Sequence, residues 1–355
     1  MLTMLAFIFV LGVLIFIHEL GHFLVAKKVG IKVEKFSLGF PPNIFAKKWG
    51  ETTYCIGLIP LGGYVKMAAE NPGEETTGSP DEFMSKSVGE RAAVIFAGPF
   101  MNYVLAIVLL IGIFMFSGKA VYDDNKVVVG EVVDGSPAQL ADLRIDDIII
   151  AIDNHPIANF DSLRNRINAV VERPIDLTWT RGNDTINAAM TTIISEVPNL
   201  DGSIDTVGVI GFSQKPVRYE SYGVGEAFEQ GFITAHVIVW ETIKFIKRIV
   251  SGEVSAKMIG GPIFIAQQSG KEARKGAANL FFFMALLSVN LAVLNVLPIP
   301  VLDGGSLVFL AMEKLKGSPL SMRARVIAQQ VGLVVLLGLI LVVTYNDIIR
   351  WLQSI

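Results

Sequence analysis

The first long apolar run of the chain carries three polar side chains whose spacing suits metal chemistry. In the stretch IFIHELGHFLVA, residues 15–26, His18 and His22 stand four positions apart, with Glu19 next to the first. Residues i and i+4 share one face of a helix, so the two imidazoles can bind one metal ion. Glu19 can then hold a water molecule against that ion. The pattern H-E-x-x-H is typical of zinc sites in which the glutamate acts as a general base.

A buried pair formed by His18 and Glu19, with His22 satisfied separately, is the alternative explanation of these residues. A charged side chain at the centre of a bilayer costs about 2.5–3.5 kcal/mol on insertion scales. Zinc binding at structural sites reaches roughly 10–16 kcal/mol, which would offset that cost. We therefore favour Zn2+ as the cofactor, with the two histidines as ligands and Glu19 as the catalytic residue.

The composition is that of an integral membrane protein. Hydrophobic residues make up 52% of the 355 residues and charged residues 18%, whereas soluble domains carry about 25% charged residues. A spanning helix needs about 20 predominantly apolar residues. Four segments meet this requirement: 3–26, 93–116, 280–302 and 327–345. The net charge of −3 gives no argument for a nucleic-acid partner, and the single cysteine excludes an intrachain disulfide.

Lysine and arginine are concentrated in two loops, 27–92 and 304–326. The positive-inside rule places both loops in the cytoplasm, and the long segment 117–279 on the other side of the membrane together with both termini. We predict a membrane core in two halves. The first is 1–116, with 27–92 as a cytoplasmic or re-entrant loop, and the second is 280–355.

A catalytic zinc needs a third protein ligand and one open position. None of the four predicted spans contains a third histidine, and the best candidate is Asp303 in NVLPIPVLDGG. Asp-Gly-Gly taken alone is more often a turn. The predicted first and third spans run in the same direction, however, so Asp303 reaches the same depth as the two histidines. Pro298 and Pro300 break the helix just before it, and irregular backbone is tolerated there if it lines a protein cavity.

Residues 120–194 predict a small inserted α+β domain. Alternating apolar residues in KVVVGEVV indicate a strand, DGSPA a turn into a short helix, and IDLTWTRGNDTINAAM two strands around a turn. The order, and the run GSPA followed by ADLRIDDI, resemble a circularly permuted bacterial PDZ domain. Asp142 and Asp146 stand where glycines are commoner. Some other small α+β domain is the alternative.

The linker 195–279 contains an amphipathic segment, 224–250. Its apolar residues line one helical face, which predicts a helix lying on the membrane surface. Length alone would also allow a fifth span. Six charged residues in the segment argue against a span, as does the reversal of the third helix that it would cause.

Together these motifs resemble the site-2 protease family of intramembrane zinc metalloproteases, and within it the bacterial regulator-of-sigma-E type. HELGH lies in the first span, LNVLPIPVLDGG in the third, and the PDZ-like domain between the second and third. The resemblance extends to LIPLGGYVKM (58–67), FAGPFMN (96–102) and GGPIFIA (260–266). One departure is that the chain has room for a single PDZ domain. Another is a proline in GFPP (39–42) where a glycine is common.

The resemblance implies His18, His22 and Asp303 as zinc ligands and Glu19 as the catalytic base. It also implies that TTYCIGLIPLGGYVKM is a β-hairpin that dips into the membrane beside the active site. Residues expected to bind substrate are Asn295, Pro298, Pro300, Gly62 and Gly63. An ordinary tight turn is the alternative for the two glycines.

We therefore predict an α-helical polytopic membrane protein with about four transmembrane helices, a membrane-dipping β-hairpin and an inserted α+β PDZ-like domain. The predicted function is an intramembrane zinc metalloprotease of the bacterial cytoplasmic membrane, with its PDZ-like domain on the periplasmic side. Its expected partners are the lipid bilayer and single-pass membrane proteins, such as an anti-sigma factor or remnant signal peptides. The alternative is a non-catalytic scaffold or transporter with structural zinc, which would have no use for Glu19.

Overall fold

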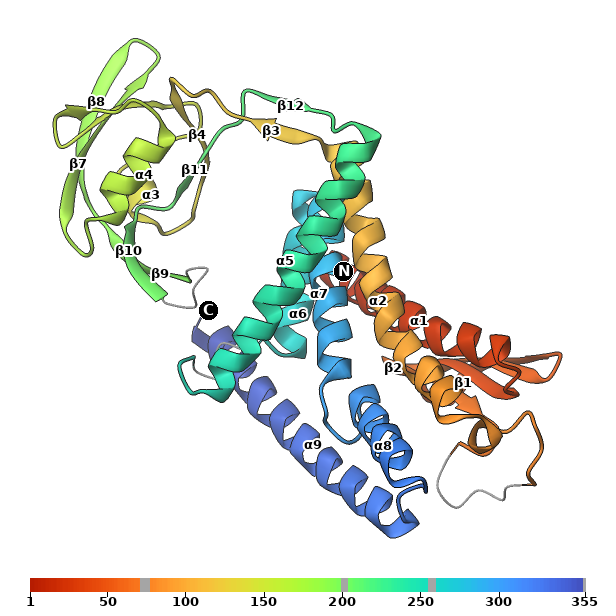
Figure 1. Ribbon diagram of the computed structural model, residues 1–355. Helices are drawn as coiled ribbons and strands as arrows, with labels where there is room; N and C mark the ends of the chain where they lie inside the picture. Colours follow the sequence, from red (N-terminus) through yellow and green to blue (C-terminus); the bar gives the residue numbers. More distant parts are fainter. Residues whose placement is uncertain (71–76, 199–203, 255–259, 354–355) are drawn as a thin grey trace. The chain divides into compact units, whose positions relative to one another are not determined.

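The computed structural model describes residues 1–70, 77–198, 204–254 and 260–353. They form two compact units, residues 1–115 with 223–355, and residues 116–222 (Figure 1). The first unit carries all the predicted site residues. The second is the inserted domain.

Four helices of the described residues are long and apolar enough to cross a membrane, which confirms the prediction of four spans. They are α1 (Leu2–Lys28), α2 (Val88–Ser117), α7 (Ala277–Val296) and the part Met322–Ile349 of α9 (Met322–Gln353). The third span ends at Val296, earlier than the predicted 302. Pro298 lies just beyond this end, and a proline cannot donate the backbone hydrogen bond that continues a helix.

Helices α1 and α2 approach each other closely because glycines face the contact. A Cβ atom on Gly21 of α1 would fall on the backbone carbonyl of Ala97 in α2. Near its N-terminus α1 contacts α6 (Pro262–Lys275), where a Cβ on Gly270 would meet Thr3. The N–H groups of Gly261 and Phe264 at the start of α6 donate to Asp347 of α9, at 3.1 and 2.9 Å. These contacts fix the helix that carries the histidines.

The amphipathic segment forms α5 (Val224–Val250), with the predicted bounds. Its buried residues Ala235 and Ile238 pack with apolar residues of α2 and α7, and Thr242 donates to Asn290 of α7 at 2.7 Å (Figure 1). The apolar face is thus covered in part by the spanning helices. Its placement on a membrane surface stays a prediction.

Strands β1 (Val33–Trp49) and β2 (Thr52–Met67) form one long hairpin. The segment expected to be a hairpin by itself, 52–67, is a single strand whose partner precedes it in the chain. The hairpin folds over on itself, since Phe36 pairs with both Tyr54 and Val65. Phe36 also packs against Phe23 of α1, with ring centroids 5.4 Å apart. The far part of the hairpin exposes Phe40, Phe45 and Trp49.

The inserted unit is built on a sheet with the strand order β11-β4-β5-β7-β8, and β6 pairs with β5. Its core contains Leu163, Leu177 and Trp179, each at most 1% exposed. The sheet strands are β4 (Val127–Val132), β5 (Ile148–Ile152), β6 (His155–Pro156), β7 (Pro174–Arg181), β8 (Asp184–Thr191) and β11 (Phe212–Gln214). The other elements are α3 (Pro137–Leu140), α4 (Phe160–Asn168), the ribbon of β9 (Ile193–Pro198) and β10 (Ile204–Val209), and the pair β3 (Lys119–Val121) and β12 (Arg218–Glu220).

This β-rich domain between the second and third spans confirms the predicted insertion. Its predicted end at residue 194 is too early, because β11 completes the sheet beside β4 and β12 pairs with β3. Asp142 and Asp146 have φ angles of +62° and +72°. Glycine adopts this left-handed conformation at the least cost, which explains why glycine is the commoner residue there.

Candidate metal centre and active site

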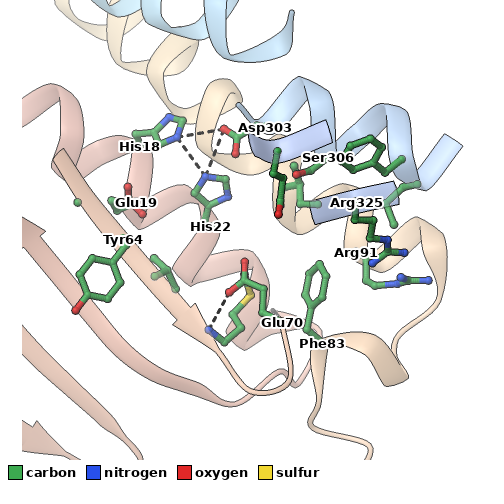
Figure 2. A pocket seen from close by; sticks show the side chains of 17 residues that line it. His18, Glu19, His22, Tyr64, Glu70, Phe83, Arg91, Asp303, Ser306 and Arg325 are labelled. Atoms are coloured by element: carbon green, nitrogen blue, oxygen red, sulfur yellow. Dashed lines mark hydrogen bonds and ion pairs between the residues drawn. The ribbon is translucent and has the colours of Figure 1, made fainter. Parts of the chain in front are cut away.

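Three side chains that are far apart in sequence converge inside the helical unit (Figure 2). His18 and His22 come from α1, and Asp303 is the first residue of α8 (Asp303–Lys316). Oδ2 of Asp303 lies 3.2 Å from Nε2 of His18 and 3.6 Å from Nε2 of His22. One potential ligand atom from each residue lies within 4.8 Å of the others. The structure therefore brings together the three residues that the sequence predicted as ligands.

The donor set fits a zinc ion. Oδ2 of Asp303 is buried and receives no hydrogen bond from the described residues, although two imidazole nitrogens lie close to it. Nδ1 of His22 lies 2.9 Å from the carbonyl oxygen of Val94. A carbonyl can only accept, so Nδ1 carries the proton and Nε2 presents its lone pair to the cluster. Two imidazoles and one carboxylate leave one position open, as catalytic zinc sites require.

Asp303 owes its position to the tight packing of the loop before it. A Cβ on Gly304 would collide with the carbonyls of Val296 and Leu297, and one on Gly305 would collide with that of Ile299. Glycine at both positions therefore lets the loop lie directly on the first turn of α8. The carboxylate at this first turn is also favoured by the helix dipole.

Glu19 lies beside the cluster in a cavity of about 300 Å3 (Figure 2). Glu19 is 9% exposed. A Cβ on Gly63 of β2 would lie 2.8 Å from Cγ of Glu19, so the strand packs directly against the Glu19 side chain at this glycine. The cavity is open enough for a water molecule beside a general base.

Only one of the five residues expected to bind substrate lies in the described lining of the cavity. Gly63 lines the cavity, whereas Gly62 faces the ring of Phe40. Asn295 is half-buried in the last turn of α7, Pro298 is exposed and Pro300 is half-buried, and the three do not appear in the described lining of the cavity. Pro300 instead packs on α9, where a Cβ on Gly332 would meet its carbonyl oxygen.

The end of the cavity away from the histidines holds a buried ion cluster that sequence reasoning missed. Arg91 of α2 makes two hydrogen bonds to Glu313 of α8, at 3.2 and 2.5 Å, and Arg325 of α9 donates to Glu313 at 3.4 Å. The available signal was that Arg91 and Arg325 each stand two residues before a predicted span. The cluster ties together the helices that carry and flank Asp303.

Sequence reasoning also missed the contribution of α2 to the centre. Gly98 faces both imidazoles, since a Cβ there would meet Nε2 of His22 and Cε1 of His18. The side-chain nitrogen of Asn102 lies 3.1 Å from Nδ1 of His18. Both residues belong to FAGPFMN, and the asparagine is a polar residue in an apolar span, which is a functional signal in itself.

A histidine pair, two carboxylates and a cavity lie inside a bundle of potential membrane spans, which is the arrangement expected of a membrane-embedded hydrolase that binds a metal ion. The chain matches the model of peptidase family M50 over residues 6–339, and it belongs to this family, that of the site-2 proteases. The predicted metalloprotease is thereby confirmed at the level of the family.

Relatives cover nearly the whole chain. A Rhizobium meliloti protein named as a candidate zinc metalloprotease is 36% identical over 99% of this chain and 97% of its own. The regulator of sigma-W protease RasP of Bacillus subtilis is 29% identical, over 98% of both chains. Among solved structures, the PDZ domain of an SdrC-like protein from Listeria monocytogenes matches 27% of this chain and 93% of its own, with 20% identity and a TM-score of 0.21.

Proposed function

We propose that this protein uses zinc held by His18, His22 and Asp303 to hydrolyse peptide bonds in or next to the transmembrane segments of single-pass membrane proteins. The observation that carries the proposal is the convergence of the three ligand atoms beside the buried carboxylate of Glu19. Zinc in such a centre lowers the pKa of water and polarises a carbonyl group. The family and the zinc metalloprotease names of its relatives support this assignment.

Glu19 acts as the general base and then as the general acid. Its carboxylate takes a proton from the attacking water as the C–O bond forms. It returns that proton to the amide nitrogen as the C–N bond breaks, so that water is consumed and an amine and a carboxylic acid are released. The walls around Glu19 exclude bulk water, because the side chain is 9% exposed and β2 covers it at Gly63.

The hairpin is suited to hold an unwound substrate. A peptide that leaves its helix within lipid needs partners for its N–H and C=O groups. Strand β2 passes Glu19 between Gly63 and Val65, which both line the cavity. An extended segment that pairs with this strand would lie across the catalytic carboxylate, as in strand addition.

We further propose that the protein resides in a bacterial cytoplasmic membrane with the inserted domain on the periplasmic side. Its substrates would be an anti-sigma factor already trimmed by another protease, or remnant signal peptides. The distribution of lysine and arginine supports the orientation, and the name of the Bacillus subtilis relative supports a link to a sigma factor. In this view the inserted domain acts as a size filter that rejects substrates with large outer domains.

Capture of a new substrate C-terminus by the inserted domain is the second candidate role. An apolar groove of about 480 Å3 lies between α4 and the segment that leads into edge strand β11. The charges of Asp142 and Asp146 do not argue against this role, because Asp142 pairs with Arg144 and Arg181, and Asp146 with Lys215. The two roles predict opposite effects of removing the domain.

The proposed activity is tested with the purified protein and a single-pass model substrate in detergent micelles or vesicles. Cleavage should occur within or next to the transmembrane segment, stop with a zinc chelator and return when zinc is restored. Cleavage that continues unchanged after zinc has been removed would contradict the proposal.

A further inference from the structure

Nδ1 of His18 faces the buried side-chain amide of Asn102. Asn102 is 0% exposed, and its side-chain nitrogen lies 3.1 Å from Nδ1 of His18. Its backbone is held in place as well, because Ser288 of α7 donates from Oγ to the carbonyl oxygen of Asn102 at 2.7 Å. Asn102 therefore occupies a fixed position behind the histidine.

The other branch of this amide is unsatisfied. Oδ1 of Asn102 is buried and has no hydrogen-bond partner among the described residues. A buried acceptor left unpaired costs about 1–3 kcal/mol. The two branches of an amide have the same shape, so a half-turn about the Cβ–Cγ bond places Oδ1 where the nitrogen lies and brings it within reach of Nδ1 of His18.

The chemistry of a metal ligand decides between the two orientations. For Nε2 of His18 to give its lone pair to zinc, the neutral imidazole must carry its proton on Nδ1. That proton then needs an acceptor, and Oδ1 of Asn102 supplies one at this position. The amide nitrogen would instead require a lone pair on Nδ1 and a proton on Nε2, which blocks the metal.

We infer that Asn102 is a positioning residue that accepts a hydrogen bond from Nδ1–H of His18 and so fixes the ring as a zinc ligand. The inference rests on the proposed zinc site. With this inference, three residues of α2 that are four positions apart all lie on the helix face that contacts the H-E-x-x-H motif. The carbonyl of Val94 accepts from His22, Gly98 leaves room for both rings, and Asn102 accepts from His18.

Two substitutions of Asn102 distinguish its role as a hydrogen-bond acceptor from its contribution to packing. Asn102→Leu keeps a similar volume but offers no acceptor, whereas Asn102→Asp offers acceptor oxygens and no donor. The control is Ser288→Ala, which removes the hydrogen bond to the backbone of Asn102 and leaves its side chain unchanged. Zinc affinity is measured on the full-length protein in detergent by competition with a chelator of known affinity, and thermal unfolding without zinc reports on folding.

Asn102→Leu should weaken zinc binding by about 10–100-fold, the usual effect of losing a partner of a metal-ligating histidine. Asn102→Asp and Ser288→Ala should bind zinc about as tightly as the unaltered protein. If the Leu variant binds zinc normally, or the Asp variant loses as much as the Leu variant, the inference is overturned. If the Leu variant does not fold, the zinc affinity of the Asp variant alone tests the inference. Normal zinc affinity in the Asp variant is expected only if residue 102 accepts the hydrogen bond. An unaltered protein that binds no zinc would instead overturn the proposed zinc site.

Discussion

The substitution Gly98→Ala tests whether the glycine of α2 is needed to leave room for the proposed zinc ligands His18 and His22. The added Cβ would lie 2.6 Å from Cε1 of His22 and 2.9 Å from Cε1 of His18. Carbon atoms pack at about 3.5 Å, so the rings must retreat by roughly 0.6–0.9 Å. Zinc–ligand distances tolerate deviations of only about 0.2 Å. His22 has little freedom to adjust, because its Nδ1 is hydrogen-bonded to the carbonyl of Val94 at 2.9 Å.

Gly98→Ala should therefore bind zinc more weakly, and its cleavage rate should fall by about 10²-fold, the scale expected for misplacing a reacting group by 1 Å. The matched control is Gly112→Ala on the same helix, where a Cβ would have no neighbour within 4 Å. Alanine favours a helix over glycine by up to about 1 kcal/mol, so the control should be neutral or slightly stabilising. The assay combines zinc retention against a graded chelator with cleavage of a model transmembrane substrate. Equal zinc affinity and equal cleavage rates in the two variants would show that the space at Gly98 is not needed for zinc binding.

Three further predictions concern β2, the inserted domain and its pH dependence. Gly63→Ala should lower the cleavage rate by about tenfold or more while zinc content is unchanged, since its Cβ would press on Glu19 and not on a ligand; loss of zinc in this variant would contradict that. Val121 pairs with Arg218, so replacing residues 122–217 by an Asn-Gly turn removes the domain with little strain. If the domain is a size filter, the deletion variant should cleave untrimmed substrate. If the domain captures a new C-terminus, the variant should instead cleave trimmed substrate more slowly. Burial raises the pKa of Asp147, but hydrogen bonds from Arg181 and the Arg144 N–H outweigh it and hold that pKa below its usual value. The stabilisation is thus present above the usual carboxyl pKa of about 3.9 and is lost as the pH falls through the lower folded value. Hydrogen exchange of β5 and β7 in the full-length protein should rise below about pH 4, and Arg181→Leu should weaken that dependence; an unchanged pH profile in this variant would contradict the assignment.

The sequence predicted the parts of the structure that depend on local pattern. Four apolar runs became four potential spans, and the amphipathic segment 224–250 became α5 with the same bounds. His18 and His22 were predictable because their spacing alone places them on one helical face. Asp303 required an argument about the direction of two spans, and the structure places it beside both histidines.

The remaining features depend on contacts that no local pattern encodes. The family resemblance implied a hairpin within 52–67, but this segment is the single strand β2, and its partner β1 precedes it in the chain. This pairing depends on how the two strands fold over each other, which the alternation of either segment does not encode. The end of the inserted domain was missed because β11 is three residues long and joins the sheet beside β4, far away in sequence. Asn102 and Gly98 belong to the motif FAGPFMN, but their contacts with the two histidines arise only because α2 lies against α1.

The proposed zinc protease is tested most directly by measuring zinc content and cleavage rate in one preparation of Glu19→Gln, next to Asp303→Ala. Glu19→Gln should keep one zinc ion per chain and lose about 10²-fold or more in rate, because the amide cannot carry the proton. Asp303→Ala should lose both zinc and activity, because two imidazoles alone leave the ion under-coordinated. A Glu19→Gln variant that cleaves at a near-normal rate would contradict the role of Glu19 as general base, and an Asp303→Ala variant that keeps full zinc and full activity would contradict its role as a zinc ligand.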